Sequence, residues 1–290
     1  LIEDTKIDPS KVDELIAGQV LTAGQGQNPA RQTAISAGLP IDVASYTVNQ
    51  VCGSGLQSVC LGAMSIASGN NQLVVAGGQE SMSNAYHCAY IRKGAKMGNV
   101  NFIDTMVYDG LTDIFSKQAM GITAENIAKK YQISRSQQDE FSYLSQQKAL
   151  AAQNSGKFSQ EVIPIELASK KETALLARDE FIRADTSLEG LAKLKPAFLE
   201  GGTVTAGNSS GINDGAAFVM LASQQAINKH NLSPLARIVA FAHHGVEPGL
   251  MGTGPIAATK KVLDKAGWKI SDLDLIESNE AFAAQSLCVI

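Results

Sequence analysis

Hydrophobic residues in the first 83 positions follow two spacings in turn, one typical of buried strands and one typical of helices. Short apolar runs at 12–20, 43–48 and 73–76 have the length and composition of strands. Between them, apolar residues at 29–37 and 56–67 recur at helical spacing. This strand–helix–strand–helix–strand order predicts a parallel sheet with helices on both faces.

The pattern changes between about 84 and 211, a region that holds most of the polar and charged residues. Helices are predicted there at about 123–131 and at 134–154. The second begins with Ser134 followed three positions later by Gln137, the spacing of a capping box. We interpret the region as an inserted, mostly helical subdomain.

Strand-like segments return after this insertion. They lie at 216–222, at 235–242 and around 273–277, with helices predicted at 255–266 and from about Glu280. The last strand–helix unit weakly repeats the first, which indicates two duplicated halves. The chain is thus predicted to contain an N-terminal half at 1–83, an inserted loop domain at 84–211, a return to the N-terminal half at 212–234 and the start of a C-terminal half at 235–290.

Composition and charge exclude several classes of function. The 290 residues are 44% hydrophobic and 18% charged, with a formal net charge of -4 and no basic run that suits a phosphate backbone, so nucleic-acid binding is not expected. No stretch approaches the roughly 18 uninterrupted apolar residues of a membrane span. The four cysteines form no C-x-x-C pair, so neither a disulfide framework nor a metal site is expected. We expect a cytoplasmic protein.

Cys52 stands between a predicted strand and a predicted helix. Gly53 and Gly55 can accept positive φ and close packing, so they permit a sharp turn that exposes the thiol at the positive end of the helix dipole. A small buried cysteine at a tight turn fits the same pattern equally well. Cys60 and Cys288 are predicted to be core residues, and the role of Cys88 stays open.

A thiol in such a position needs further activation. An ordinary thiol of pKa ~8.5 is only ~3% thiolate at pH 7. A helix N-terminus contributes ~0.3–1 kcal/mol, which raises that fraction to about 15% at most. A general base, most often histidine, is therefore required. The candidates are His87, His230, His243 and His244, none of which lies in a recognisable motif.

Several long motifs, in the correct order, resemble those of the thiolase family over essentially the whole chain. They are GQGQNPARQ at 24–32, NQVCGSGL at 49–56, AGGQESMS at 76–83, GGTVTAGNSSG at 201–211, MGTGP at 251–255 and NEAFAAQ at 279–285. Within that family the sequence is most similar to the acetyl-CoA acetyltransferases (acetoacetyl-CoA thiolases). The resemblance implies a five-layer α/β/α/β/α fold of two similar halves with an inserted, mostly helical loop domain, the second half being incomplete.

The resemblance also implies a ping-pong reaction. The residue matching Cys52 attacks an acyl-CoA thioester, and its own backbone N–H helps form an oxyanion hole. A second acetyl-CoA then loses an α-proton and attacks the acyl-enzyme to give acetoacetyl-CoA and CoA. Asn279 matches the residue that holds a water in a second oxyanion hole, and a role as helix N-cap is compatible with this. No cofactor is expected to be tightly bound, CoA being substrate or product, and a homodimer or homotetramer is implied.

The family's contacts with CoA carry over to particular residues. Arg183 resembles the cation near the nucleotide end, and Ser210 resembles the hydroxyl that contacts the pantetheine arm. The apolar walls of the tunnel around that arm correspond to Met120, Phe198 and Phe282. Related bacterial enzymes often have histidine before this methionine, where the chain has Ala119. The position before Met120 thus departs from the family's pattern.

The family's G-H-P motif, which supplies the base, and its later C-x-G motif, which supplies a second cysteine, do not follow Asn279. We therefore expect a chain truncated at both ends and inactive by itself. A broad-range 3-ketoacyl-CoA thiolase and a non-catalytic acyl-CoA-binding remnant are the alternatives. The Cys-Gly-Ser-Gly sequence and 251–255 favour the short-chain enzyme.

Overall fold

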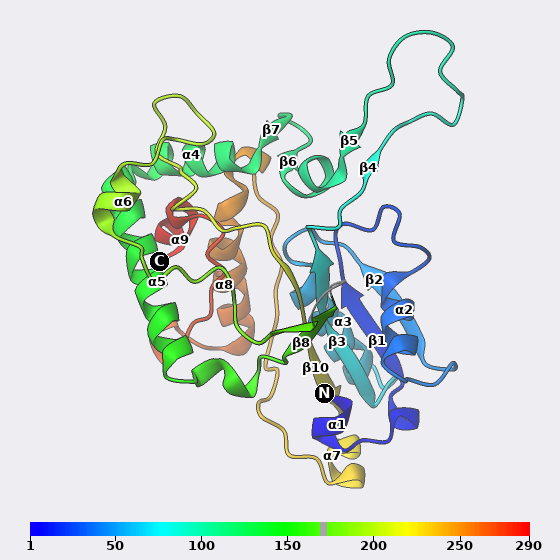
Figure 1. Cartoon of the computed structure of the whole chain (residues 1–290). Helices are drawn as coiled ribbons and strands as arrows, with labels where there is room; N and C mark the ends of the chain where they lie inside the picture. Colours follow the sequence, from blue (N-terminus) through cyan, green and yellow to red (C-terminus); the bar gives the residue numbers. More distant parts are fainter. Residues whose placement is uncertain (169–172) are drawn as a thin grey trace. The chain divides into compact units, whose positions relative to one another are not determined.

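The computed structural model describes residues 1–168 and 173–290 (Figure 1). The chain divides into two compact units. The first comprises Leu1–Ile114, Ile212–Ala242 and Val262–Trp268, and the second comprises Phe115–Gly211, His243–Lys261 and Lys269–Ile290. The four-segment division inferred from the sequence stays a prediction.

A four-stranded sheet organises the first unit. Its order is β10 (Asp214–Ala222), β3 (Leu73–Ser81), β1 (Glu14–Gly18) and β2 (Ala44–Val48). Strand β1 pairs in parallel with β2 and β3, while β10 runs antiparallel to β3. The strands predicted in this region are confirmed. Strand β3 extends beyond its apolar run because it pairs with β10 along its full length.

Helices α2 (Pro29–Ser36) and α3 (Ser54–Ala67) lie on opposite faces of this sheet. From α2, the Thr33 hydroxyl donates to the Gln79 side chain at 2.6 Å. From α3, Gly55 packs against Gly78, the neighbouring residue of the same strand. Successive strand residues point to opposite faces, so the predicted coverage of both faces is confirmed.

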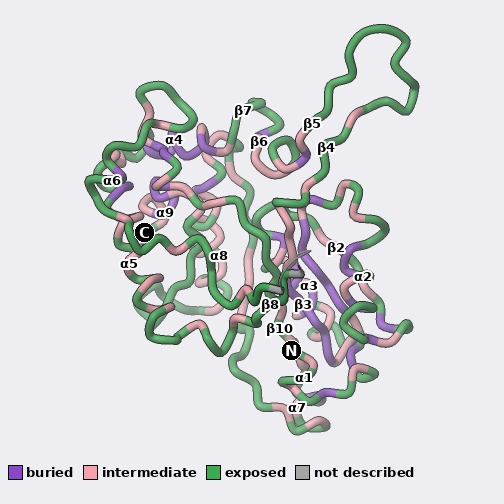
Figure 2. The backbone as a smooth tube through the Cα atoms, viewed as in Figure 1, coloured by how far each residue is buried: buried purple, intermediate pink, exposed green. Residues whose placement is uncertain are grey.

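The hydrophobic core of the first unit lies between the sheet and α2. Strands β1 and β3 form its buried centre (Figure 2). The buried cluster consists of Ile7, Val12, Leu15, Ala17, Ala30, Ala34, Leu39, Val43, Leu73, Val75 and Ala226. Most of these positions lie in the predicted strands and helices, whereas Ile7, Leu39 and Ala226 lie outside them.

Helix α3 buries small and polar residues instead of the apolar face that its spacing predicts. Its buried residues include Ser58 and Gly62, whereas Leu56 is 72% exposed. The Ser58 hydroxyl donates to the Gly77 carbonyl at 2.7 Å, which places the helix directly on β3. At so short a distance only small side chains fit, so the predicted role of Leu56 in the helix's apolar face is wrong.

Replacing Gly77 with alanine is expected to destabilise the first unit by about 3 kcal/mol, because the new Cβ has no space. That atom would lie 2.1 Å from the Ala217 carbonyl oxygen and 2.7 Å from the Phe218 Cα, and the β3–β10 ladder holds this backbone in place. Gly215→Ala on β10 is the matched control, since its Cβ meets nothing within 4 Å. Equal denaturant midpoints for the two variants would contradict the expectation.

The rest of the first unit is short elements around this sheet. They are α1 (Ile2–Thr5), α7 (Gln224–His230), the 3₁₀ turn at Pro9–Lys11, the π turn at Met106–Gly110, β4 (His87–Cys88), β5 (Ile103–Asp104) and β6 (Thr112–Asp113). Strands β4 and β5 pair antiparallel and carry a long loop that projects away from the sheet of this unit (Figure 1). The loop exposes large apolar side chains such as Tyr90 and Met97.

The second unit is mainly helical. Its long helices are α4 (Met120–Tyr131) and α5 (Arg135–Asn154), and the Ser134–Gln137 capping box is confirmed. Helix α9 (Ala283–Val289) packs against both of them. The remaining elements are β7 (Gln118–Ala119), the antiparallel pair β8 (Ile165–Ala168) and β9 (Thr173–Leu176), α6 (Leu188–Ala192), and 3₁₀ turns at Lys157–Gln160, Pro248–Thr253 and Ile270–Asp272. Helix α8 (Gly254–Ala266), which belongs to this unit up to Lys261 and to the first from Val262, confirms the helix predicted at 255–266.

Two predicted strands are wrong, namely 235–242 and the segment around 273–277, which are irregular. A strand requires a neighbouring strand for its backbone groups, and the described residues provide none for either segment. Instead, the Phe241 carbonyl accepts a hydrogen bond from the Lys265 ammonium at 3.0 Å. Among the described residues, no helix has the length and apolar character needed to cross a membrane.

Candidate active site

Cys52 lies in the turn between β2 and α3, with its side chain exposed. Gly53 is the N-cap of α3, and the helix begins at Ser54. The thiol therefore lies close to the N-terminus of a fourteen-residue helix. The first N–H groups of a helix have no partner within it, so they are available to negative charge that develops beside this end.

The sharp bend of this turn is at Val51. Its φ is 49°, in the left-handed region, whereas Gly53 has an ordinary helical φ of -81°. The prediction that the glycines supply the positive φ is therefore wrong. A β-branched residue in this region costs roughly 1–2 kcal/mol, and such strain persists only where neighbouring contacts impose it.

Hydrogen bonds from two side chains impose this conformation. The Asn49 side chain accepts from the Val51 N–H at 2.8 Å, closing an Asx turn. The Ser54 hydroxyl, which is buried, accepts from the Gln50 N–H at 2.8 Å and donates to the Val51 carbonyl at 2.6 Å. Sequence reasoning did not identify these roles. The Asn-x-x-Cys-x-Ser spacing was visible, but the direction of each side chain was not.

The glycines near Cys52 allow close packing, as predicted. A Cβ on Gly18, the last residue of β1, would lie 2.3 Å from the Ser54 carbonyl carbon. Gly55 similarly lies against Gly78 of β3. The start of α3 thus rests directly on the ends of two parallel strands, which fixes the position of the turn that carries the thiol.

The other cysteines differ from Cys52. Cys60 is buried, as predicted, and burial raises the pKa of its thiol. Cys288 is half-buried on α9, and burial raises its pKa as well. Cys88 is exposed but lies on the two-residue strand β4. Only Cys52 combines exposure with a helix N-terminus.

The base for Cys52 stays unassigned. His87, in the same unit, lies 3.9 Å from the Asp104 carboxylate across the β4–β5 pair. His230 is the last residue of α7, while His243 and His244 belong to the second unit. Within the described part of the chain, no group of three or more His, Cys, Asp or Glu side chains is arranged to hold a metal ion.

Asn279 belongs to the second unit, in the segment that precedes α9. It is exposed and non-helical, and the helix expected from about Glu280 begins only at Ala283. The N-cap of α9 is Phe282, so the suggested capping role of Asn279 is wrong. Helix formation starts late because the Ala281 carbonyl accepts from the Ser210 N–H at 2.9 Å.

The residues matched to the pantetheine tunnel come together in the second unit. The Phe198 and Phe282 rings pack edge to face with centroids 6.2 Å apart. Phe198 also lies so close to Gly121 that a Cβ there would be 2.2 Å from its ring, so the ring packs on the first turn of α4, the helix that begins at Met120. Ser210 is joined by its backbone to the segment that carries Phe282.

Arg183 lies in the same unit. Its guanidinium is 5.8 Å from the centre of the Phe181 ring, within cation–π range. Phe181 in turn covers Gly211, where a Cβ would lie 2.1 Å from the ring. The exposed guanidinium is thus held near the loop that contains Ser210. All of the CoA-binding candidates and Asn279 belong to the second unit, and Cys52 belongs to the first.

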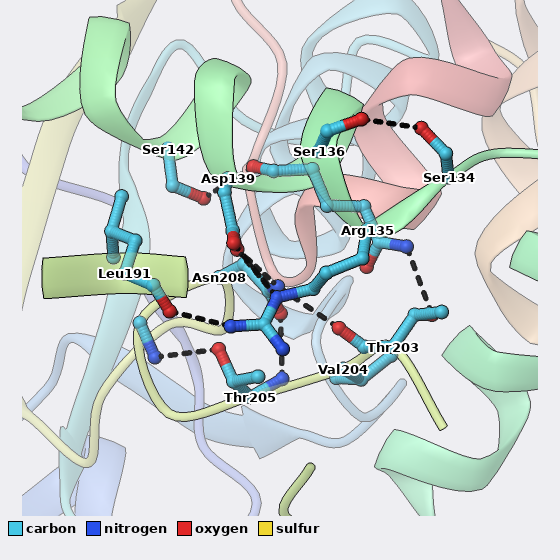
Figure 3. A network of polar contacts seen from close by, with 12 residues as sticks. Ser134, Arg135, Ser136, Asp139, Ser142, Leu191, Thr203, Val204, Thr205 and Asn208 are labelled. Atoms are coloured by element: carbon cyan, nitrogen blue, oxygen red, sulfur yellow. Dashed lines mark hydrogen bonds and ion pairs between the residues drawn. The ribbon is translucent and has the colours of Figure 1, made fainter. Parts of the chain in front are cut away.

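A buried polar network holds the 201–211 loop (Figure 3). Arg135 donates through Nε to both oxygens of Asp139 at 2.9 and 2.8 Å. Asp139 accepts from the Asn208 amide at 3.0 Å, and Asn208 accepts from the Thr205 N–H at 2.7 Å. The Asn208 carbonyl accepts from the Ala283 N–H at 3.0 Å. The network therefore joins α5 to the loop and to the start of α9.

Glu125 of α4 holds the other end of this loop. Its carboxylate accepts from the N–H groups of Thr203 and Val204, each at 2.8 Å. Glu125, Asp139 and Asn208 are buried, and sequence reasoning missed all three. The GGTVTAGNSSG motif marked the loop, but not the distant carboxylates that hold it.

The fold and the cysteine turn together define an α/β protein with a thiol presented at a helix N-terminus. Residues 1–225 match the sequence model of the thiolase N-terminal domain, and 232–290 match that of the thiolase C-terminal domain. The chain belongs to the thiolase family, as its motifs indicated.

Its relatives include an acetyl-CoA acetyltransferase of Paracoccus denitrificans, 53% identical over 100% of this chain and 74% of the relative. The crystal structure of the Bacillus anthracis acetyl-CoA acetyltransferase has a TM-score of 0.96 and 40% identity, over 99% of this chain and 73% of that one. Human mitochondrial 3-ketoacyl-CoA thiolase has a TM-score of 0.95 and 41% identity, over 99% and 73%. The predicted thiolase fold is confirmed.

Proposed function

We propose that this protein is an acetyl-CoA acetyltransferase that condenses two acetyl-CoA molecules reversibly to acetoacetyl-CoA and CoA through an acyl group on Cys52. The observation that carries the proposal is the exposed thiol at the N-terminus of α3 in a chain 53% identical over its whole length to an acetyl-CoA acetyltransferase. Backbone N–H groups at such a terminus can stabilise the negative charge that develops during acyl transfer.

In the first half-reaction, the Cys52 sulfur forms a bond with the thioester carbonyl carbon, and the CoA thiolate leaves. A base takes the thiol proton. The Cys52 N–H lies beside the attacking sulfur in the turn that leads into α3, which supports its use as a donor to the developing oxyanion.

In the second half-reaction, an acetyl-CoA enolate attacks the acetyl group on Cys52 and displaces the sulfur. A donor that stabilises the enolate oxygen lowers the barrier to α-proton removal. We assign to Asn279 the positioning of a water that makes this contact. Its exposure, in a segment held extended by Ser210, supports that role.

CoA itself is proposed to bind along the second unit. Met120, Phe198 and Phe282 would contact the apolar part of the pantetheine arm, and Ser210 would form a hydrogen bond with it. Arg183, exposed beside Phe181, would pair with phosphate at the nucleotide end. The clustering of these side chains around one loop supports the assignment.

A broad-range 3-ketoacyl-CoA thiolase is the second candidate. Human mitochondrial 3-ketoacyl-CoA thiolase is as similar in structure as the acetyltransferase of Bacillus anthracis, so the fold does not separate the two activities. The ratio of acyl-enzyme formed from acetyl-CoA to that formed from a longer 3-ketoacyl-CoA would distinguish them.

Acetylation of Cys52 by acetyl-CoA tests the proposal directly. The protein would be incubated with acetyl-CoA at pH 9, where an ordinary thiol of pKa ~8.5 is mostly thiolate and less dependent on a base. Peptide mass spectrometry is expected to find the acetyl group on Cys52 and much less on Cys88, which is also exposed. Retention of CoA with no acetyl group on Cys52 would instead support the non-catalytic acyl-CoA-binding alternative.

A further inference from the structure

The Ser54 hydroxyl holds the peptide group that carries the Cys52 N–H. The Val51 carbonyl and the Cys52 N–H belong to one planar trans peptide group, so they point in opposite directions. The Val51 carbonyl accepts from the Ser54 hydroxyl at 2.6 Å and from the Ser54 N–H at 3.0 Å. Fixing the carbonyl on one side therefore fixes the direction of the Cys52 N–H on the other.

The strained residue is held on both sides. Relaxation of Val51 from φ 49° would rotate the peptide group that precedes it, in which the Val51 N–H donates to the Asn49 side chain at 2.8 Å and the Gln50 carbonyl accepts from the Gly53 N–H at 3.1 Å. The Ser54 hydroxyl joins the backbone before Val51 to the backbone after it, since it accepts from the Gln50 N–H at 2.8 Å and donates to the Val51 carbonyl at 2.6 Å. Ser54 is only 4% exposed, so water does not compete effectively for these bonds.

We propose that Ser54 is a positioning residue that aims the Cys52 N–H at the oxyanion formed during acyl transfer. The inference rests on the proposed function, since an oxyanion forms only when Cys52 attacks a carbonyl. A donor stabilises an oxyanion only when its N–H points at the oxyanion, and loss of a donor typically lowers the rate about 10²–10³-fold. Ser54 does not touch the reacting atoms, and its own N–H still holds Val51 when the hydroxyl is removed. The expected effect is therefore smaller, about tenfold.

Two reactions of the Cys52 sulfur distinguish an effect on the direction of the Cys52 N–H from an effect on the reactivity of the thiol. Acetylation by acetyl-CoA passes through an oxyanion, whereas alkylation by iodoacetamide attacks a saturated carbon and forms none. In Ser54→Ala, we expect the acetylation rate of Cys52 to fall about tenfold or more, and its alkylation rate to change less than about threefold. A purely structural role would change both rates together or neither.

Ser58→Ala is the matched control. Ser58 is also buried on α3 and also forms two hydrogen bonds through its hydroxyl, which lies 2.7 Å from each of its two acceptors, the Gly55 and Gly77 carbonyls. Its removal is expected to lower stability comparably and to leave the ratio of the two rates unchanged. Should Ser54→Ala not fold, Asn49→Ala removes an exposed side chain that holds the Val51 N–H, and it is expected to lower the ratio several-fold.

The outcomes distinguish this inference from the proposed function. The positioning role would be supported if the unsubstituted protein is acetylated and the ratio of acetylation rate to alkylation rate is lower in Ser54→Ala or Asn49→Ala than in Ser58→Ala. Acetylation with an unchanged ratio in the folded test variant would overturn the role of Ser54 alone. Absence of acetylation in the unsubstituted protein would overturn the proposed function, and the inference with it.

Discussion

Replacing Cys52 with serine is expected to abolish acyl-enzyme formation from acetyl-CoA and to lower acetyl transfer by at least about 10⁴-fold. Removal of a nucleophile that acts with a base lowers the reaction rate by factors of this size, because the remaining groups then have no covalent step to assist. A serine hydroxyl has no appreciable anionic fraction near neutral pH, and a helix N-terminus contributes far too little to supply one. The measurements are acetyl incorporation by mass spectrometry and CoA release after mixing with acetyl-CoA.

The same substitution is expected to leave the fold unchanged, since the Cys52 side chain is exposed and the turn is held by Asn49 and Ser54. Cys88→Ser is the matched control, because it replaces another exposed cysteine of the same unit. Cys88→Ser is expected to retain both acetyl incorporation and CoA release. If Cys52→Ser retained acetylation while Cys88→Ser lost it, the nucleophile would be misassigned.

The parallel part of the fold was predicted correctly because each segment there has a strand-like pattern and also has neighbouring strands to pair with. Strands β1 and β3 are compact apolar runs that lie in the interior of the sheet, and β2 pairs with β1 at its edge, each strand being separated from the next by helical spacing. The strand predictions that failed are those of apolar segments that have no neighbouring strand among the described residues. Residues 235–242 are apolar enough for a strand, but pairing depends on another strand being present, which a local pattern does not reveal.

The candidate site was predicted to the extent that it lies in continuous motifs. The residues around Cys52 predicted a turn there, and the resemblance to thiolases implied the nucleophile, but neither predicted that Val51 is the residue that bends. Glycine is the usual source of positive φ, yet Val51 is forced into it by Ser54 and Asn49. Such a conformation depends on the directions of side chains, so residue type and spacing do not determine it.

Replacing Asp139 with alanine is expected to lower the free energy of unfolding of the second unit by about 3 kcal/mol. The Asp139 side chain is 6% exposed and pairs with Arg135, whose side chain is 24% exposed, and breaking a buried pair costs about 3–5 kcal/mol. The lower end applies because the arginine keeps some access to water. The Asn208 amide loses an acceptor as well, which adds to the cost of burial.

The same substitution tests whether the network positions the CoA contacts. Asn208 joins Asp139 to the backbone of Ala283, next to Phe282, and Ser210 lies two residues further along the same loop. We therefore expect Asp139→Ala to weaken CoA binding about tenfold, measured by calorimetry at a temperature where the variant is folded. Asp139→Asn keeps the shape and one acceptor oxygen, so its losses should be intermediate.

Glu140→Ala is the control for this experiment, because Glu140 is the next residue of α5 and is exposed. Substitutions at such a surface position usually change stability by less than about 0.5 kcal/mol. CoA affinity should be retained in this variant. If Asp139→Ala lost stability but bound CoA as tightly as Glu140→Ala, the network would stabilise the helices without positioning the loop. If Asp139→Ala lost both stability and CoA affinity while Glu140→Ala kept them, the buried ion pair would be connected to the CoA contacts, because Asn208 joins the two.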